Sequence, residues 1–267
     1  MTLDLVQRQR QASNGVCART TFGCRRIKFR RFLPILALLC FALPVQATWT
    51  LVQHPNAICA SSPCAITINS TDIGHIGIVG LMSYKSAVHI SSVSGGGNWV
   101  HPSGCLAQTS DGTSTDLAYL WNETKGTTSI GVTFSGKAGQ GYIEYAEYST
   151  TAPSVWFDGC GTNVINSDGT LPAGPSLTLS GSNDVIVQAA VCGGNNLNAI
   201  TPPYTNPDDF PNSFGFAGAI NQSTGAAPIW TCGTYRTAAA SAIAIKEEAG
   251  AASWLKSVWI WFISRIL

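Results

Sequence analysis

Two glutamates three residues apart are the groups in this chain best suited to acid–base chemistry. Glu144 and Glu147 both lie in the segment 142–148. Glycoside hydrolysis uses two carboxyl groups about 5–9.5 Å apart in one cleft. Residues three apart on a regular strand point to opposite faces, so this pair would need a bulge to meet. The spacing favours one structural and one solvent-facing carboxylate. The alternative is a hydrolase in which Glu144 or Glu147 works with a loop acid, such as Asp208 or Asp209.

Aromatic side chains beside polar, glycine-rich segments are the clearest indication of a binding site. Sugars present C–H faces that stack on flat rings, while Asn, Asp and Thr hydrogen-bond the sugar hydroxyls. The positions predicted to bind a ligand in this way are Trp99, Trp156, Tyr204 and Trp230. Large aromatic residues also fill β-sheet cores. For Tyr119 and Trp121, which share a predicted strand face with Leu117, we expect the core.

Other catalytic and metal-binding patterns do not occur in the sequence. It contains no Gly-x-Ser-x-Gly elbow, no His-Glu-x-x-His and no Cys-x-x-Cys. Gly136-Lys137 resembles the end of a phosphate loop, but Ala138 stands where the magnesium-binding hydroxyl belongs. The histidines lack the spacing of helical metal ligands: His54, His75, His89 and His101. We therefore expect no metal and no cofactor, and we assign no catalytic residue.

Residues 24–47 have the three parts of a secretory signal peptide. Basic residues end at Arg31, an apolar run spans 32–43, and Val45 and Ala47 form a small-residue cleavage site. A membrane-spanning helix needs about 20 apolar residues, so we expect cleavage after Ala47 rather than a permanent anchor. Residues 1–23 form a polar, basic extension, predicted to be disordered unless the true start lies downstream. Export would make the protein secreted or place it in the cell envelope.

Six cysteines follow the predicted signal peptide, and an even number in an exported chain indicates disulfides. They are Cys59, Cys64, Cys105, Cys160, Cys192 and Cys232. Cys59 and Cys64 flank Ala-Ser-Ser-Pro, so we expect them to close a short hairpin. The other pairs that we predict are Cys105–Cys160 and Cys192–Cys232, although six cysteines leave other pairings open.

Alternation of apolar and other residues dominates the mature chain and predicts β-strands. Ile130, Val132 and Phe134 follow this pattern, and 184–191 places its valines on one face. The segment 76–82 is almost continuously apolar, which is typical of a central strand covered on both sides. Further strands are expected at 49–53, 64–69, 87–93, 117–123, 141–148, 176–180, 229–235 and 239–246.

Short strands separated by glycine-rich turns predict an all-β fold, an antiparallel β-sandwich or jelly roll over residues 48–247. The proline-rich segment 193–215 shows no alternation and is predicted to be a long surface loop. The segments 97–99, 117–121, 128–135 and 147–149, with the closing strand 242–246, resemble a pattern common in uncharacterised exported bacterial β-sandwich proteins. That resemblance covers about residues 65–247, implies the fold and brings no activity with it.

The charges of the chain are unevenly distributed. Residues 1–31 carry eight of the fifteen Lys and Arg side chains and one of the fourteen acids. From residue 48 onward, seven basic groups therefore face thirteen acidic ones. Such an acidic body repels phosphate backbones, so on charge alone we expect no nucleic-acid partner.

Residues 248–267 differ from everything before them because the chain becomes apolar and tryptophan-rich. We predict a short helix for this tail. The stretch 254–267 would be about 21 Å long as a helix, too short for the roughly 30 Å hydrocarbon core. Its tryptophans and two basic residues favour a weak contact with a membrane surface. Packing on the sandwich or remaining mobile are the alternatives.

These observations together predict an exported, non-catalytic β-sandwich protein that binds a glycan or another cell-surface ligand. The alternative is the carbohydrate-active hydrolase described above, so the sequence leaves open whether the chain is an enzyme. Sandwich folds host both kinds of function, and the fold does not distinguish them.

Overall fold

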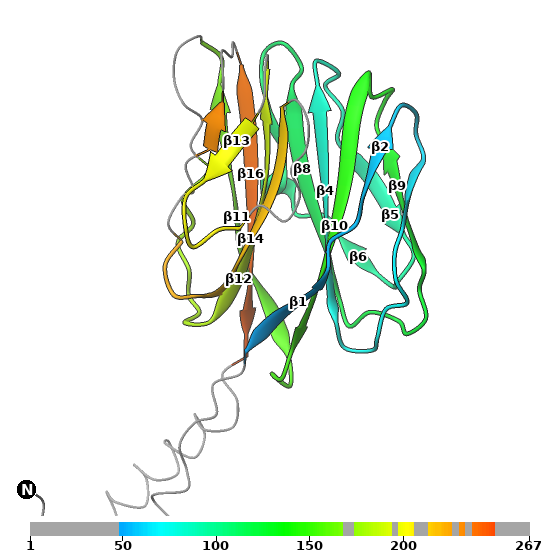
Figure 1. Cartoon of the computed structure of the whole chain (residues 1–267), viewed down its shortest axis with the longest axis vertical. Helices are drawn as coiled ribbons and strands as arrows, with labels where there is room; N and C mark the ends of the chain where they lie inside the picture. Colours follow the sequence, from blue (N-terminus) through cyan, green and yellow to red (C-terminus); the bar gives the residue numbers. More distant parts are fainter. Residues whose placement is uncertain are drawn as a thin grey trace, which may run out of the picture. The chain divides into compact units, whose positions relative to one another are not determined.

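The computed structural model describes residues 48–167, 174–193, 197–205, 213–225, 230–232 and 237–248 (Figure 1). Their elements are β-strands in antiparallel sheets, together with one 3-10 turn, η2 (Ser103–Cys105). No helix with the length and hydrophobicity of a membrane span occurs in this part of the chain. The predicted extension 1–23, the signal peptide 24–47 and the helical tail after Glu248 lie outside the described residues.

The largest sheet has seven strands. Its order is β1-β10-β4-β8-β6, with β2 also pairing with β10 and β7 with β8. The strands are β1 (Trp49–Gln53), β2 (Asn56–Cys59), β4 (Ile76–Tyr84), β6 (Trp99–Val100), β7 (Ala107–Gln108), β8 (Ser114–Trp121) and β10 (Gln140–Thr150).

Three smaller sheets complete the described fold. The four-stranded sheet has the order β11 (Val155–Ile165), β16 (Ala238–Glu247), β12 (Asp184–Cys192) and β14 (Phe214–Gln222). The three-stranded sheet has the order β3 (Cys64–Thr67), β9 (Ser129–Phe134) and β5 (Ile90–Ser94). The two-stranded sheet pairs β13 (Leu197–Ile200) with β15 (Trp230–Cys232).

Strand β4 is covered on both faces, as its apolar sequence predicts. Ile78 and Met82 belong to one hydrophobic cluster, which also contains Val187 of the four-stranded sheet. Val79 and Leu81 point the other way and join a second cluster with residues of the three-stranded sheet. The seven-stranded sheet therefore has hydrophobic contacts on each side. Figure 1 shows the four-stranded sheet and the three-stranded sheet flanking it.

Strand β12 is also buried on both faces, which its alternating valines did not predict. Val185 and Val187 face the seven-stranded sheet. Ile186 and Ala190 point away from it, into a third cluster that includes Trp230 of the two-stranded sheet. Because alanines on β16 and β12 carry small side chains on this outer face, the covering residues can approach closely.

The sequence analysis missed six strands of the described fold: β2, β6, β7, β11, β13 and β14. Strand β11 is an edge strand rich in glycine and polar residues, and β14 alternates glycine with larger residues, so neither gives a clear apolar period. The prediction of a surface loop over 193–215 is wrong for β13, for Tyr204 and for the start of β14, whereas residues 201–203 are an exposed turn. Leu197 and Tyr204 are buried in the third cluster, because the outer face of the four-stranded sheet needs an apolar cover.

Two of the predicted disulfides are confirmed. Cys59–Cys64 joins β2 of the seven-stranded sheet to β3 of the three-stranded sheet. Cys105–Cys160 joins η2 to β11 of the four-stranded sheet. Cys192 is disulfide-bonded as well. The side chain of Cys232 lies outside the described ones, so the pair Cys192–Cys232 stays a prediction.

Candidate functional site

Trp156 has the most exposed aromatic side chain in the described part of the chain, with 57% of its surface accessible. It lies on β11 directly opposite Lys246 of β16, which is itself opposite Asp184 of β12. Opposite residues of antiparallel strands share a face. Their neighbours Val155 and Ile245 face the seven-stranded sheet, so these three residues point away from it. We call them the β11–β16–β12 row.

Asp158 fixes one side of this row. A bulge after Phe157 inserts Asp158 into β11. One carboxylate oxygen, Oδ2, accepts hydrogen bonds from the backbone nitrogens of Ser180 (2.6 Å) and Gly181 (3.3 Å), and the other accepts one from the Ser180 hydroxyl. Lys246 Nζ lies 2.9 Å from Asp158 Oδ1. Burial raises the pKa of Asp158, but the hydrogen bonds from Ser180 and Lys246 outweigh it and lower the pKa below its usual range.

Asp184 is the buried member of the row, with no exposed surface. Burial is the main cause that raises its pKa to about 7, and the neighbouring Asp158 carboxylate adds to the effect. Lys246 opposes the increase through its positive charge. Asp184 thus exchanges its proton near neutral pH, while Asp158 remains ionised.

The row combines a flat ring in solvent with polar groups that are already held in place. Such a surface suits a ligand with an apolar face and hydroxyl groups, which is the chemistry of a sugar. Lys246 Nζ donates to Ser180 Oγ as well as pairing with Asp158, so the polar side of the row is pre-organised.

The other predicted ligand-binding aromatics behave differently, and two of them are corrected. Tyr204 is 5% exposed and Trp230 is fully buried, because both pack in the third cluster on the outer face of the four-stranded sheet. Neither presents a ring for stacking. Trp99 is half-buried: its Nε1 donates to the Gly95 carbonyl at 2.7 Å, and its ring meets Tyr145 edge-on.

Tyr119 and Trp121, which the sequence assigns to the core, are partly buried against the first cluster. The Tyr119 ring stacks on Phe157 of β11, with 5.6 Å between ring centroids. This contact links the seven-stranded and four-stranded sheets beside the exposed Trp156.

The predicted glutamate pair is divided between two faces. The β10–β4 ladder runs without a bulge from Gln140 to Tyr148, so Glu144 and Glu147 point in opposite directions, as their spacing predicts. The expectation that one of them faces solvent is wrong, since both are fully buried. The reason is that β10 is covered by hydrophobic clusters on both faces.

Glu147 belongs to a buried acid cluster with a residue that the sequence analysis missed, Glu123. Both oxygens of Glu147 accept hydrogen bonds, one from Gln53 Nε2 and one from His75 Nδ1. Tyr145 OH donates to Oε1 of Glu123, which is also fully buried. Burial raises the pKa of Glu123 to about 7, with a smaller contribution from the charge of Glu147 and against the lowering effect of the Tyr145 hydrogen bond. Asp208 and Asp209 lie outside the described residues.

The position of Glu123 gives the only sequence signal that could have revealed it. It is the last residue of the predicted strand 117–123 and lies two residues beyond the observed end of β8 at Trp121, where a polar residue is ordinarily a turn residue. Its carboxylate folds back over the start of β4, so that a Cβ at Gly77 would be 2.3 Å from Glu123 Oε1. The glycine is what leaves room for a buried acid at this end of the sheet.

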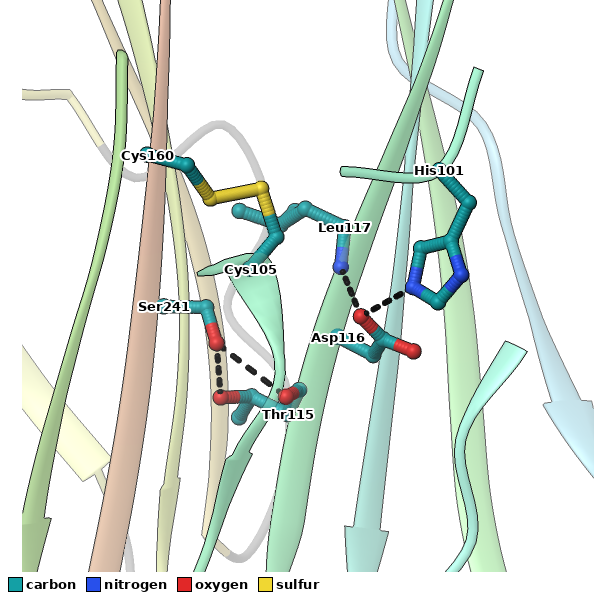
Figure 2. Close-up of a disulfide and its surroundings, with 7 residues drawn as sticks. All are labelled: His101, Cys105, Thr115, Asp116, Leu117, Cys160 and Ser241. Atoms are coloured by element: carbon teal, nitrogen blue, oxygen red, sulfur yellow. Dashed lines mark hydrogen bonds and ion pairs between the residues drawn. A yellow bond between two sulfur atoms is a disulfide. The ribbon is translucent and has the colours of Figure 1, made fainter. Parts of the chain in front are cut away.

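A second histidine–carboxylate contact lies near the Cys105–Cys160 disulfide (Figure 2). His101 Nε2 is 2.7 Å from Oδ1 of the fully buried Asp116, which also accepts a hydrogen bond from the backbone nitrogen of Leu117. The Asp116 hydrogen bond raises the pKa of His101. On the opposite face of β8, Thr115 Oγ1 lies 2.7 Å from Ser241 Oγ, so polar contacts hold β8 on both sides.

No group of three or more His, Cys, Asp or Glu residues with metal-binding geometry occurs among the described residues. Comparisons with protein-family models, curated proteins and solved structures found no match to this chain. The resemblance to exported bacterial β-sandwich proteins therefore remains a prediction, and function has to be argued from the side chains themselves.

Proposed function

We propose that this protein is an exported, non-catalytic β-sandwich of the jelly-roll kind that binds a glycan, or another surface ligand, through the face around Trp156. The observation that carries the proposal is the exposed Trp156 indole beside Lys246, Asp158 and Ser180, which hold one another in position. Because Lys246, Asp158 and Ser180 already bond to one another, binding would cost little side-chain entropy for these groups.

The disulfides support the exported location in this proposal. Cys59–Cys64 and Cys105–Cys160 each connect two sheets, and such bonds persist in oxidising compartments outside the cytoplasm. Together with the signal-like segment 24–47, they favour a protein that works at the cell surface or beyond it.

A glycan array probed with the mature protein and with Trp156→Ala tests the binding function. Loss of a central aromatic anchor typically costs 2 kcal/mol or more, so we expect binding to weaken by roughly thirtyfold. Ile58→Ala is the matched control, because Ile58 is an exposed apolar residue, 74% accessible, on a strand of another sheet. Equal binding by Trp156→Ala and the parent protein would reject Trp156 as the binding residue.

The second candidate function is a carbohydrate-active hydrolase that uses Glu147 with Glu123 as its loop acid. One observation favours it: the two carboxyl groups interact, and their surroundings differ. Glu147 accepts two hydrogen bonds, whereas burial raises the pKa of Glu123 to about 7. Two carboxyl groups in different surroundings can divide the roles of acid and base in catalysis. Against it, both side chains are fully buried.

A hydrolysis screen with Glu147→Gln distinguishes the two candidates. Turnover of an oligosaccharide by the parent protein, abolished in Glu147→Gln while the fold stays intact, would favour the hydrolase. Binding without turnover would favour the proposed binding function. Circular dichroism at the same protein concentration provides the check on folding.

A further inference from the structure

The electrostatic surroundings of Trp156 are acidic, and this limits the kind of sugar that suits the site. Glu248 follows β16, and its backbone nitrogen donates to the Ser154 carbonyl at 2.9 Å. The Ser154 hydroxyl donates to the Glu248 carboxylate. Ser154 is two residues before Trp156, so Glu248 lies on the same side of the strand pair as the exposed ring.

The one basic group of the row is already compensated. Lys246 Nζ pairs with Asp158 at 2.9 Å, so these two charges offset each other locally. Glu248 is exposed, and its carboxylate has the Ser154 hydroxyl as partner rather than a cation. Among the described residues, Lys246, Asp158 and Glu248 together therefore give the surroundings of the indole a net negative charge before Asp184 is counted.

Asp184 adds a buried carboxyl group to this surface. The side chain has no exposed area, and its carboxyl group interacts with the Asp158 carboxylate and with the charge of Lys246. A buried carboxyl next to Asp158 and Lys246 can be stabilised by a positive charge placed over the row. The chain from residue 48 onward is acidic as a whole, with thirteen acids against seven bases.

A positive group above an indole is attracted by the ring as well as by nearby carboxylates. The face of tryptophan is the best of the aromatic side chains at binding cations. A sugar with a free, protonated amine can stack on Trp156 and place its charge near Glu248. An N-acetylated sugar can only stack, and a sugar acid is repelled by the same carboxylates.

On these grounds we infer that the ligand of the Trp156 face is an amine-bearing glycan, a chain of glucosamine-type sugars with free amino groups. This inference rests on the proposed glycan-binding function and specifies its ligand class. The positive charge supplies the selectivity, and the indole supplies a contact that both charged and neutral sugars share.

The test compares glucosamine oligosaccharides with N-acetylglucosamine oligosaccharides of the same length, by titration calorimetry at mildly acidic pH, where the amine is protonated. A cation over an exposed ring contributes about 0.5–1 kcal/mol, so we expect the free amine to bind about two- to fivefold more tightly. Added salt should reduce this preference, because exposed charges are screened.

Variants of Glu248 and Trp156 separate the contribution of the carboxylate to binding from that of the indole ring. We expect Glu248→Gln to reduce the preference for the amine and leave binding of the acetylated sugar unchanged. The matched control is Asp72→Asn, because Asp72 is an exposed acid that pairs with Lys125 at 3.2 Å in a different part of the chain. Trp156→Ala should weaken binding of both sugars, and it should weaken the free-amine sugar more, because that sugar also loses the contact of its cation with the indole.

The failures of the two proposals are distinguishable. Equal affinities, or tighter binding of the acetylated sugar, would overturn the amine preference and leave glycan binding intact. An unchanged preference in Glu248→Gln would equally overturn the electrostatic argument. If neither these sugars nor any other glycan binds, the proposed function fails and the inference fails with it.

Discussion

Replacing the buried Glu123 by glutamine should change how the stability of the protein depends on pH. Glu123 has no exposed surface, and burial raises its pKa from 4.5 to about 7. A folded-state pKa above the unfolded one means that the folded protein binds the proton more tightly. Below pH 4.5 the Glu123 carboxyl is protonated in both the folded and the unfolded state, so its ionisation does not lower the stability. As the pH rises from 4.5 to about 7 the cost grows, and above 7 it stays constant.

The size of this effect follows from the two pKa values. The interval from 4.5 to about 7 corresponds to about 3 kcal/mol. Glutamine keeps the shape of the side chain and an oxygen that accepts from Tyr145, but it does not ionise. Between pH 4 and pH 8 the parent protein should therefore lose about 2 to 3 kcal/mol of stability relative to Glu123→Gln. Any change in stability that the new amide causes equally at every pH does not affect this difference.

Urea unfolding at a series of pH values measures this difference in the free energy of unfolding. The slope m, by which that free energy falls with urea concentration, must be the same for both proteins. Glu248→Gln is the control, because Glu248 is exposed and its removal changes the net charge by the same amount. Parallel stability curves for the parent and Glu123→Gln would refute the reasoning. They would mean that Glu123 is better solvated than its burial indicates.

Three further predictions concern the scaffold and its processing. Replacing Cys105 and Cys160 together by alanine should lower the free energy of unfolding by about 2–5 kcal/mol, measured by denaturant titration, because this bond joins η2 to β11. Gly80→Ala should destabilise the protein by about 1–3 kcal/mol in the same assay, since the new Cβ would lie 2.7 Å from the ring of Phe216. N-terminal sequencing of the exported protein should find the chain starting after Ala47, and an intact leader on that form would reject cleavage.

The pattern of apolar residues in the sequence predicted the local elements best. The continuous run in β4 predicts a strand covered on both faces, since a strand with a wet face alternates. The pairs Cys59–Cys64 and Cys105–Cys160 are confirmed. The opposite directions of Glu144 and Glu147 follow from the two-residue period of a strand. The strand pattern and the directions of the two glutamates depend only on neighbouring residues, whereas Cys105–Cys160 joins residues 55 positions apart.

Contacts between distant segments decided what those patterns could not. Tyr204 and Trp230 are core residues only because the four-stranded sheet has an apolar outer face that they cover. Glu123 and Glu147 are 24 positions apart and meet because β8 and β10 both pair with β4.

Trp156 shows the same division most clearly. Its sequence neighbourhood indicates a ring beside polar residues, but burial depends on which face of β11 it occupies and on what lies above that face. The sequence by itself determined the candidate aromatics and the strands with a clear apolar pattern, because those depend on local period and composition. The tertiary structure alone selected Trp156 and aligned it with Lys246 and Asp184, because register across three strands is set by long-range pairing.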